Sequence, residues 1–387
     1  MRSAIVGYGN IARLHEQVLT QQGHTIAAVC DIDPNKLKNA PGERHYTDLA
    51  EMLDHEEIDV LHICTPHYLH ADMIIEALER GINVLCEKPL CISEEDIVRV
   101  IEAAERSKAQ IGVCFQNRYN TANQAVKTYL QGKNSLCAVA SVTWYRDANY
   151  YRSGDWRGKW ATEGGGVLIN QALHTLDLVQ WLVGMPETLQ GQICCMTLSD
   201  EIEVEDTAVI LAGEKNNGFT FYATNGGPTD CPVEITLKAD GEWIKLMPKD
   251  VIYGTRHEHY EDVAHALGKA CYGSGHGALI ADFYDCVATG RYFEIDGVET
   301  YAEPFGIPEP DEVVFMGWYE GGEVFRSGCT FHRENGKIFY FQPGHETFPI
   351  YYDKNVQTII RNAVRWAAPI YRIDFSHCPN PEAVEKD

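Results

Sequence analysis

The first twelve residues contain a short apolar run that breaks into a glycine turn. Ala4 to Val6 leads into Gly7-x-Gly9-x-x-Ala12, and the chain then continues with helical periodicity. In such a turn the first glycine permits a sharp strand-to-helix reversal, and the second lets a pyrophosphate approach the backbone. The helix start, at Asn10 and Ile11, supplies N–H groups for that anion. The pattern predicts a dinucleotide-binding α/β sheet.

An acidic residue closes the next apolar segment, 25–30. Asp31 lies 24 residues after Gly7, where a carboxylate can accept hydrogen bonds from ribose hydroxyls and would repel the 2′-phosphate of NADP. NAD is therefore the predicted cofactor. The alternative is an ordinary strand–turn–helix in which Asp31 caps a helix.

Length and charge limit the classes of function. The chain has 387 residues, enough for two domains, and its net charge of −24 would repel nucleic acids and anionic membranes. No apolar stretch approaches the roughly 20 residues that span a bilayer, and the first strand begins too early for a signal peptide. We expect a cytoplasmic protein with a small neutral or polar substrate, and neither nucleic acid nor membrane as a partner.

Three segments differ in their patterning. Over residues 1–118, apolar strands alternate with amphipathic helices, which predicts a parallel sheet covered on both faces. The predicted strands are 3–6, 25–30, 58–64, 82–86 and 110–115. Ser93 and Asp96 form a capping box before a helix.

Residues 119–298 carry longer alternating segments and are predicted to form an α+β domain with an antiparallel sheet. The predicted strands are 137–146, 188–198, 206–213, 219–224, 233–238 and 242–247, with hairpin turns at Asn217-Gly218 and Asp240-Gly241. Helices near 165–183, 258–271 and 276–288 are expected on one face of that sheet. Residues 299–387 form a third segment, with a linker at 301–310, strands at 313–318, 323–327 and 337–341, and a helix at 353–367.

A charged tripeptide follows strand 82–86. Glu87-Lys88-Pro89 would lie at the carboxyl edge of the parallel sheet, where open α/β folds bind ligands. Lys88 is expected beside a nicotinamide, where its ammonium would stabilise a developing alkoxide. A surface lysine is the alternative.

A second set of polar residues follows the triple glycine 164–166. Asn170, His174 and Asp177 are spaced i, i+4 and i+7, which predicts one polar helix face. His174 would act as general base or acid, and Asn170 would position a hydroxyl. Asp177 would orient His174 or cap a neighbouring element. A hydrogen-bonded core histidine is the alternative for His174.

No metal site or hydrolase site is predicted. Histidines at 62, 67, 70, 257 and 259 lack a matching frame of cysteines or carboxylates for zinc. The 13 cysteines contain no Cys-x-x-Cys pair and are expected to be reduced and mostly buried. No Gly-x-Ser-x-Gly elbow occurs.

Four motifs together resemble the Gfo/Idh/MocA oxidoreductase family: GYGNIA at 7–12, CTP at 64–66, EKP at 87–89 and the GGG…H…D block. The resemblance covers residues 1–298. It implies an N-terminal Rossmann domain with a doubly wound parallel sheet, followed by an α+β domain. The large, mostly antiparallel open sheet of that second domain mediates dimers or tetramers in the family. The family transfers hydride between NAD(P) and a secondary carbinol, with its lysine on Lys88 and its histidine on His174. Asn170 stands where many inositol-type members carry aspartate, which leaves Lys88 and His174 to share the proton transfer.

The expected contacts follow from these motifs. Cofactor contacts are expected at Gly7, Gly9, Asn10, Ile11, Asp31, Thr65, Pro66, His70, Glu87, Lys88 and Asn117. The block at 150–160 looks like the branch acting on glycosides and free sugars, with Trp156 and Trp160 stacked on a pyranose and Arg157 on hydroxyls. Packing of these aromatic residues against the sheet is the alternative. Substrate contacts are expected at Arg118, Tyr150, Trp156, Arg157, Trp160, Asn170 and His174.

Residues 299–369, with EPFGIPEP, FYFQPGHE and NAVRWAAP, resemble the C-terminal part of the ThuA family, which is associated with trehalose and keto-sugar metabolism. Only that part is present. We expect the dehydrogenase segment to lack the final helix usual in its family and the ThuA-like tail to supply this cover, on its own dehydrogenase or on a neighbouring subunit.

Together these features predict an NAD-dependent oxidoreductase that oxidises a secondary hydroxyl of a sugar or glycoside, with C3 as the expected carbon. The alternatives are an NAD-dependent glycosidase with a cycling bound cofactor, an inositol-type dehydrogenase and a non-enzymatic sugar or dinucleotide sensor. A homodimer or homotetramer is expected.

Overall fold

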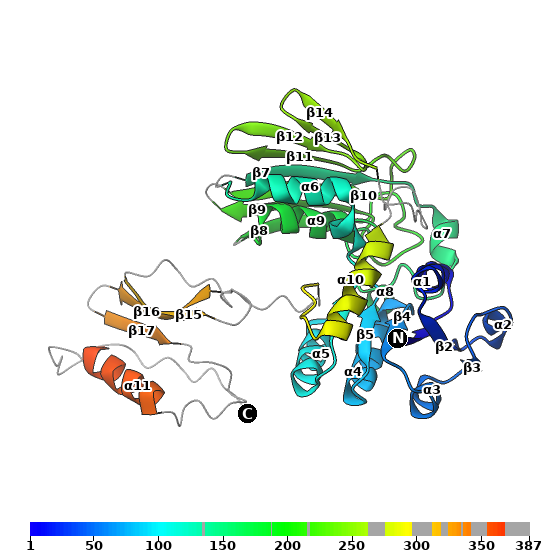
Figure 1. The fold of residues 1–387 in the computed structure, drawn as a ribbon. Coiled ribbons are helices and arrows are strands. Elements are labelled where there is room, and N and C mark those ends of the chain that lie inside the picture. The colour runs from blue at the N-terminus through cyan, green and yellow to red at the C-terminus, as the bar shows by residue number, and fades with distance from the viewer. Residues whose placement is uncertain are drawn as a thin grey trace. The chain divides into compact units, whose positions relative to one another are not determined.

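The computed structural model describes residues 1–133, 136–186, 188–214, 217–261, 275–295, 312–318, 324–333, 336–341 and 354–367. Contacts divide the chain into two compact units, Met1–Glu299 and Thr300–Asp387. The first unit contains a six-stranded and an eight-stranded sheet, and the second contains a three-stranded sheet (Figure 1).

A parallel sheet forms the first half of the larger unit. Its strands are β1 (Arg2–Val6), β2 (Thr25–Cys30), β3 (Arg44–Tyr46), β4 (Val60–Ile63), β5 (Asn83–Cys86) and β6 (Ile111–Val113), in the order β3-β2-β1-β4-β5-β6. The central strands are mostly apolar because helices bury both faces, although Ser3 of β1 and His62 of β4 are buried polar residues. The predicted doubly wound parallel sheet is confirmed. The short edge strand β3 was not predicted, since its side chains are polar or largely exposed.

Helices cover both faces of this sheet. They are α1 (Asn10–Gln21), α2 (Pro34–Leu37), α3 (Leu49–His55), α4 (His70–Glu79) and α5 (Glu94–Arg106), with the short 3-10 helices η1 (His67–Leu69) and η2 (Gln116–Tyr119). At the start of α5 the Asp96 backbone N–H donates to the Ser93 hydroxyl at 3.1 Å, so the predicted cap is confirmed.

Helix α10 (Gly275–Thr289) also packs on the parallel sheet. Its residues Leu279 and Phe283 are fully buried in a cluster with Ile5 of β1 and Leu19 of α1. The expectation that helix 276–288 lies on the antiparallel sheet was therefore wrong. Amphipathic periodicity shows that a helix buries one face, but it does not show against which sheet. Helix α10 itself covers one face of the parallel sheet.

The second sheet is large and mixed. Its strands are β7 (Leu136–Thr143), β8 (Leu189–Cys194), β9 (Thr207–Glu214), β10 (Asn217–Thr224), β11 (Glu234–Ala239), β12 (Glu242–Leu246), β13 (Asp250–Tyr253) and β14 (Arg256–His259), ordered β14-β13-β12-β11-β7-β10-β9-β8. Only the β7–β10 pair is parallel among the described pairs, so the mostly antiparallel sheet is confirmed. Strands β13 and β14 were not predicted. Residues 258 and 259, expected to be helical, belong to β14, and 262–270 lie outside the described residues.

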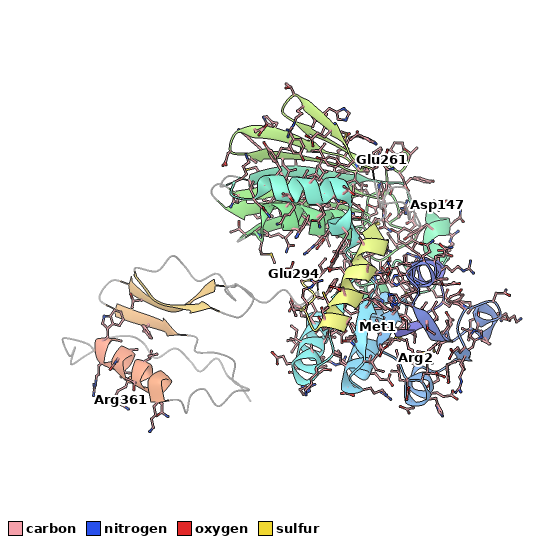
Figure 2. The ribbon with its side chains drawn as sticks, viewed as in Figure 1. Met1, Arg2, Asp147, Glu261, Glu294 and Arg361 are labelled. Carbon is pink, nitrogen blue, oxygen red and sulfur yellow. The ribbon has the colours of Figure 1, made fainter. Side chains whose placement is uncertain are left out.

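Two helices, α6 (Thr121–Leu130) and α9 (Leu173–Val183), lie along one face of this sheet (Figure 1). Side chains fill the layer between the sheet and these two helices (Figure 2). The buried residues of this layer include Val142, Phe221 and Leu237. The sheet's opposite face is exposed within the larger unit. Two short helices, α7 (Ala148–Arg152) and α8 (Trp160–Glu163), precede α9 in the chain.

Of the two predicted hairpin turns, the one at Asp240-Gly241 is confirmed and the one at Asn217-Gly218 is not. Ala239 pairs with Glu242, and Asp240 and Gly241 between them have φ angles of 47° and 91°, as a two-residue hairpin turn requires. Asn217 and Gly218 are instead the first residues of β10, and Asn217 pairs with Glu214. The predicted turn at Asn217-Gly218 is therefore wrong, and residues 215 and 216 lie outside the described residues.

The second unit has an antiparallel sheet ordered β15-β16-β17, from β15 (Glu312–Trp318), β16 (Val324–Arg333) and β17 (Gly336–Phe341), and the helix α11 (Lys354–Ala367). These elements agree with the predicted strands at 313–318, 323–327 and 337–341 and the helix at 353–367. The predicted linker at 301–310 lies outside the described residues.

Two further properties concern the described residues alone. None of their helices combines the length and apolar composition needed to cross a membrane. Ten of their cysteines are free, and six of these ten are buried. Reduced and mostly buried thiols were predicted.

Replacing Gly7 by alanine should lower the stability of the protein, whereas the same change at Gly9 should not. Gly7 has φ +82°, and a Cβ there would meet the Cys64 backbone at 2.8 Å, so we expect G7A to lower the free energy of unfolding by about 1–3 kcal/mol. At Gly9 a Cβ would meet no atom within 4 Å. Denaturant unfolding should give G9A a free energy of unfolding close to that of the wild-type chain. Equal stability of G7A would contradict the steric argument.

Candidate active site

Lys88 connects the two sheets of the larger unit. It follows β5 by two residues, and its Nζ donates to the backbone oxygen of Asn170 at 2.8 Å and to Asn170 Oδ1 at 3.3 Å. The Lys88–Pro89 peptide bond is cis. Burial lowers the pKa of Lys88 to about 8, although the charge of Glu87 opposes this shift. The ammonium is thus held at the sheet edge by neutral oxygens.

Asn170 lies in a loop, not on the predicted helix face. Helix α9 begins only at Leu173, so the predicted helix 165–183 was wrong over its first eight residues. The buried Glu205 carboxylate accepts the N–H groups of Gly166 at 2.9 Å and Leu168 at 3.0 Å, which fixes these donors outside a helix. A Cβ at Gly166 would lie 1.8 Å from the Glu205 backbone oxygen, so only glycine fits there.

Glu163 supplies a carboxylate that the sequence analysis did not identify. It is fully buried, accepts the Gly158 N–H at 2.5 Å, and accepts a hydrogen bond from the Asn170 side-chain amide. Burial raises the pKa of Glu163, against these hydrogen bonds and the charges of Arg157 and Lys88. Glu163 therefore orients Asn170 toward Lys88. Glu163 lies seven residues before Asn170, but the three glycines between them disfavour a continuous helix, so the spacing did not reveal this contact.

His174 is buried in the first turn of α9, with its ring edge-on to Phe115 at 6.3 Å between centroids. Its pKa lies well below the usual value because of burial and then of the nearby Lys88 charge. At neutral pH the imidazole is consequently uncharged and able to accept a proton. The effect of the Lys88 charge indicates that both side chains face one region.

Arg118 and Asp177 form an ion pair with each other. The Arg118 guanidinium donates to both carboxylate oxygens of Asp177, at 2.5 and 3.0 Å, and both side chains are nearly buried. Asp177 was expected to orient His174 or to cap an element, and Arg118 to contact substrate. This charge pair joins η2 to α9.

The glycine turn has the geometry expected of a cofactor site. Gly9 caps α1, the side where its Cβ would be is open, and the exposed Asn10 and partly exposed Ile11 begin the helix. The buried Asp31 accepts the Tyr8 N–H at 2.7 Å and lies 3.1 Å from Lys36 Nζ. Its two oxygens retain lone pairs for further donors.

Asn117 adds an unsatisfied acceptor at the same sheet edge. Its Oδ1 is buried and makes no hydrogen bond with any described residue. A buried amide oxygen without a donor is costly, and a carboxamide such as that of nicotinamide would provide one. The residues present therefore fit NAD.

Thr65 and Pro66 lie half-buried after β4, and His70 lies behind them. The fully buried His70 ring is within 2.9 Å of the Thr65 backbone oxygen and 2.7 Å of the Pro89 backbone oxygen. Both ring nitrogens thus face backbone groups. His70 ties the two loops together and presents no nitrogen to a cofactor, contrary to the expected contact.

Glu87 points into the protein interior, so the expected cofactor contact at this residue was also wrong. Its Oε1 lies 3.0 Å from His15 Nε2 and 3.7 Å from His276 Nε2, and all three residues are buried. Burial alone would raise the pKa of Glu87, but these two histidines hold it well below its usual value.

The same histidines extend into a buried chain. His15 Nδ1 is 2.8 Å from His62 Nδ1, and His62 Nε2 is 2.7 Å from the Tyr284 hydroxyl. Sequence patterns did not reveal the chain or the His15–Glu87–His276 cluster, because their members come from α1, β4, β5 and α10. This cluster has donor atoms within 4.8 Å of one another, in the part of the chain that the structure describes.

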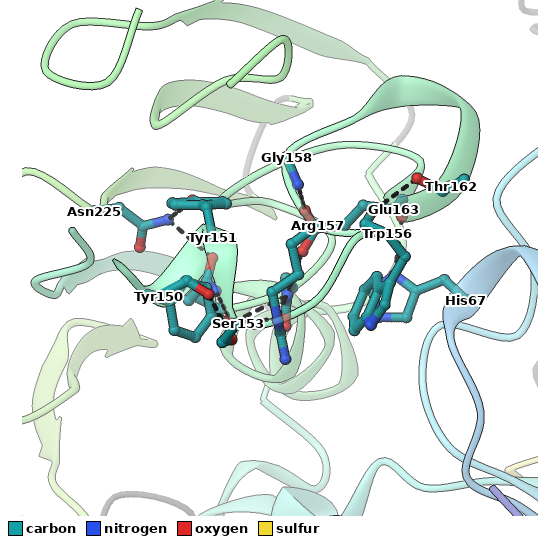
Figure 3. Close-up of polar contacts among 12 residues, drawn as sticks. His67, Tyr150, Tyr151, Ser153, Trp156, Arg157, Gly158, Thr162, Glu163 and Asn225 are labelled. Atoms are coloured by element: carbon teal, nitrogen blue, oxygen red, sulfur yellow. Dashed lines mark hydrogen bonds and ion pairs between the residues drawn. The ribbon is translucent and has the colours of Figure 1, made fainter. Parts of the chain in front are cut away.

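The predicted substrate loop surrounds an arginine (Figure 3). The Arg157 guanidinium lies between two aromatic rings, 4.5 Å from the Tyr150 centroid and 4.4 Å from the Trp156 centroid. Trp156 packs on His67, which in turn makes a 2.8 Å contact with the Glu163 backbone oxygen. Trp160 is nearly half exposed, and its indole N–H donates to the Glu203 backbone at 2.9 Å.

Two family profiles match the chain. Residues 1–115 match the oxidoreductase family with an NAD-binding Rossmann fold, and residues 121–227 match the GFO/IDH/MocA C-terminal domain. Together the two matches cover more than half of the 387 residues.

Individual proteins are similar at modest identity. The rhizopine catabolism protein MocA of Rhizobium meliloti is 27% identical over 58% of this chain and 71% of its own length. The D-apiose dehydrogenase of Rhizobium rhizogenes (strain K84 / ATCC BAA-868) is 28% identical over 62% of this chain and 71% of its own length. Other curated relatives are spanned over less than two thirds of their length.

A solved structure shares both sheets of the larger unit. The WlbA dehydrogenase from Chromobacterium violaceum, in complex with NADH and UDP-GlcNAcA, has a TM-score of 0.68 and 29% identity, covering 77% of this chain and 88% of that one. The fold class is thus supported by an independent structure.

The substitution E163Q should lower the free energy of unfolding by about 1–3 kcal/mol. A glutamine amide at this position must point a donor at either the Gly158 N–H or the Asn170 amide, which are both donors. E203Q removes an exposed carboxylate nearby and serves as the matched control. If denaturant unfolding gives the same loss for both variants, the role assigned to Glu163 is wrong.

Proposed function

Because the chain belongs to the Gfo/Idh/MocA family of oxidoreductases, we propose that it transfers a hydride between NAD and a secondary hydroxyl of a sugar or glycoside. The expected position is C3, which would give a 3-keto sugar. The proposal is supported by the half-buried Lys88 ammonium, which donates to Asn170 at 2.8 Å, and by the buried His174 imidazole, whose pKa is lowered by burial and by the Lys88 charge.

The two groups have complementary tasks in oxidation. When bound, NAD accepts the hydride from the carbinol carbon. His174 takes the hydroxyl proton, and the Lys88 ammonium stabilises the oxygen as negative charge develops on it. Asn170, oriented by Glu163, holds Lys88 in place. The reaction in the opposite direction uses the same groups in reverse.

Cofactor binding is proposed for the turn and the neighbouring strand ends. The backbone around Gly9 and the start of α1 would hold the pyrophosphate, Asp31 the ribose and Asn117 the carboxamide. This is the NAD site expected from the sequence, without His70 and Glu87.

We further propose that copies of the chain associate through the exposed face of the eight-stranded sheet. Val139, Leu211 and Trp243 are each more than half exposed there, which is typical of a surface that another chain covers. A monomeric mass in sedimentation would contradict this proposal.

The function is tested by mixing the purified chain with NAD and a panel of glycosides, hexoses and inositols. We expect NADH absorbance to rise with at least one sugar, and K88M and H174A to lower kcat/KM by about 10²–10⁴-fold. K108M and H55A change exposed residues of the same types and should leave the rate unchanged. No NADH with any compound would overturn the proposal, and aglycone release without NADH would favour the glycosidase.

The pH profile of sugar oxidation follows from the charges of the two groups. The Lys88 ammonium is needed and has a pKa of about 8, so kcat should fall tenfold per unit as pH rises above this value. His174 must be neutral and its pKa is lowered, so the acid limb should lie below pH 6.5. A profile that stays flat to pH 10 would exclude a catalytic ammonium at Lys88.

A further inference from the structure

Arg157 is held rigidly at the edge of the candidate site. Its guanidinium is sandwiched between the Tyr150 and Trp156 rings, and its Nη1 donates to the Tyr150 hydroxyl at 2.6 Å (Figure 3). The side chain is 22% exposed, so it is neither on the open surface nor sealed in the core. Stacking on two rings fixes the plane of the guanidinium and thereby the direction of its remaining N–H groups.

A hydrogen-bonded chain joins Arg157 to Lys88. The Tyr150 hydroxyl accepts from Asn170 Nδ2 at 3.3 Å, and Asn170 Oδ1 accepts from Lys88 Nζ at 3.3 Å. The Arg157 charge acts directly on Lys88 as one cause of its lowered pKa. The two cations therefore face the same region, although the chain as a whole carries a net charge of −24.

The neighbouring carboxylates do not neutralise Arg157 by direct hydrogen bonds. Glu163 lies 3.9 Å from Arg157 Nη1, beyond hydrogen-bond distance, and its oxygens accept from Gly158 and Asn170. Glu87 is engaged by His15 and His276. Over the residues that the structure describes, Arg157 Nε and Nη2 donate to no acceptor. Unpaired donors on a stacked guanidinium are a binding fork for a planar anion.

We propose that Arg157 binds a carboxylate of the substrate, so that the substrate is an acidic sugar such as a hexuronic acid or its glycoside. This inference rests on the proposed function and specifies its substrate class. A carboxylate matches the flat, two-pronged donor set better than hydroxyl groups, which gain less from a charged donor. The Lys88 ammonium would then act on the carbinol oxygen while Arg157 fixes the opposite part of the same sugar.

The test compares substrates that differ only in this group. Methyl glucuronoside and methyl glucoside are assayed with NAD, together with the corresponding galacto and manno pairs. We expect the wild-type chain to favour a uronoside over its neutral partner in kcat/KM by about 10- to 150-fold, the range for a charged hydrogen bond. In R157Q this ratio should fall toward one.

Two further variants separate charge from geometry. R157K keeps the charge without the fork and should not restore the ratio. R152Q, on the same loop, removes an exposed arginine that pairs with Glu201, and it should leave the ratio unchanged. A preference for neutral sugars or sugar phosphates, or an unchanged ratio in R157Q, would overturn the inference.

Binding of a uronoside, measured separately from turnover, distinguishes failure of this inference from failure of the proposed function. Titration of the wild-type chain with each uronoside in the presence of NADH should show heat that R157Q loses and R152Q keeps. Arg157-dependent binding without turnover of any sugar would contradict the proposed function and support the inference. Turnover of sugars without Arg157-dependent binding would contradict the inference alone.

Discussion

The contact between Lys88 and Asn170 is the interaction on which the candidate site depends. It joins the end of β5 to the loop before α9, so the site exists only where the parallel sheet and the second sheet meet. The ammonium is desolvated and held by neutral oxygens rather than by a carboxylate. A cation in this state is well suited to stabilise a developing alkoxide, because its hydrogen bonds to Asn170 go to neutral oxygens and not to a carboxylate.

The loop that carries Asn170 is held by buried carboxylates on both sides. Glu205 accepts the N–H groups of Gly166 and Leu168, and Glu163 orients the Asn170 amide. Both acids are fully or almost fully buried, which makes each lost hydrogen bond expensive. The glycine run is therefore a shaped binding loop and not the start of a helix.

A separate buried network supports the other side of Lys88. Glu87 is bonded to His15 and close to His276, and the chain continues through His62 to Tyr284. It links α1, β4, β5 and α10, the elements around the dinucleotide turn. The Glu87 carboxylate next to Lys88 is thus held by histidines, whereas the Glu163 carboxylate lies 3.9 Å from Arg157 Nη1.

The sequence by itself determined the local features: the reversal at Gly7, the cap at Ser93, the turn at Asp240-Gly241 and the placement of Lys88 after a strand. Each of these depends on residues within a few positions of one another, so spacing and residue type are sufficient. Only the tertiary structure decided that Asp177 pairs with Arg118, that Glu87 turns inward, that Asn170 leaves the helix and that α10 covers the parallel sheet. The physical reason is that buried polar groups bond to whichever donors or acceptors the packed elements bring near, and those partners lie far away in the chain.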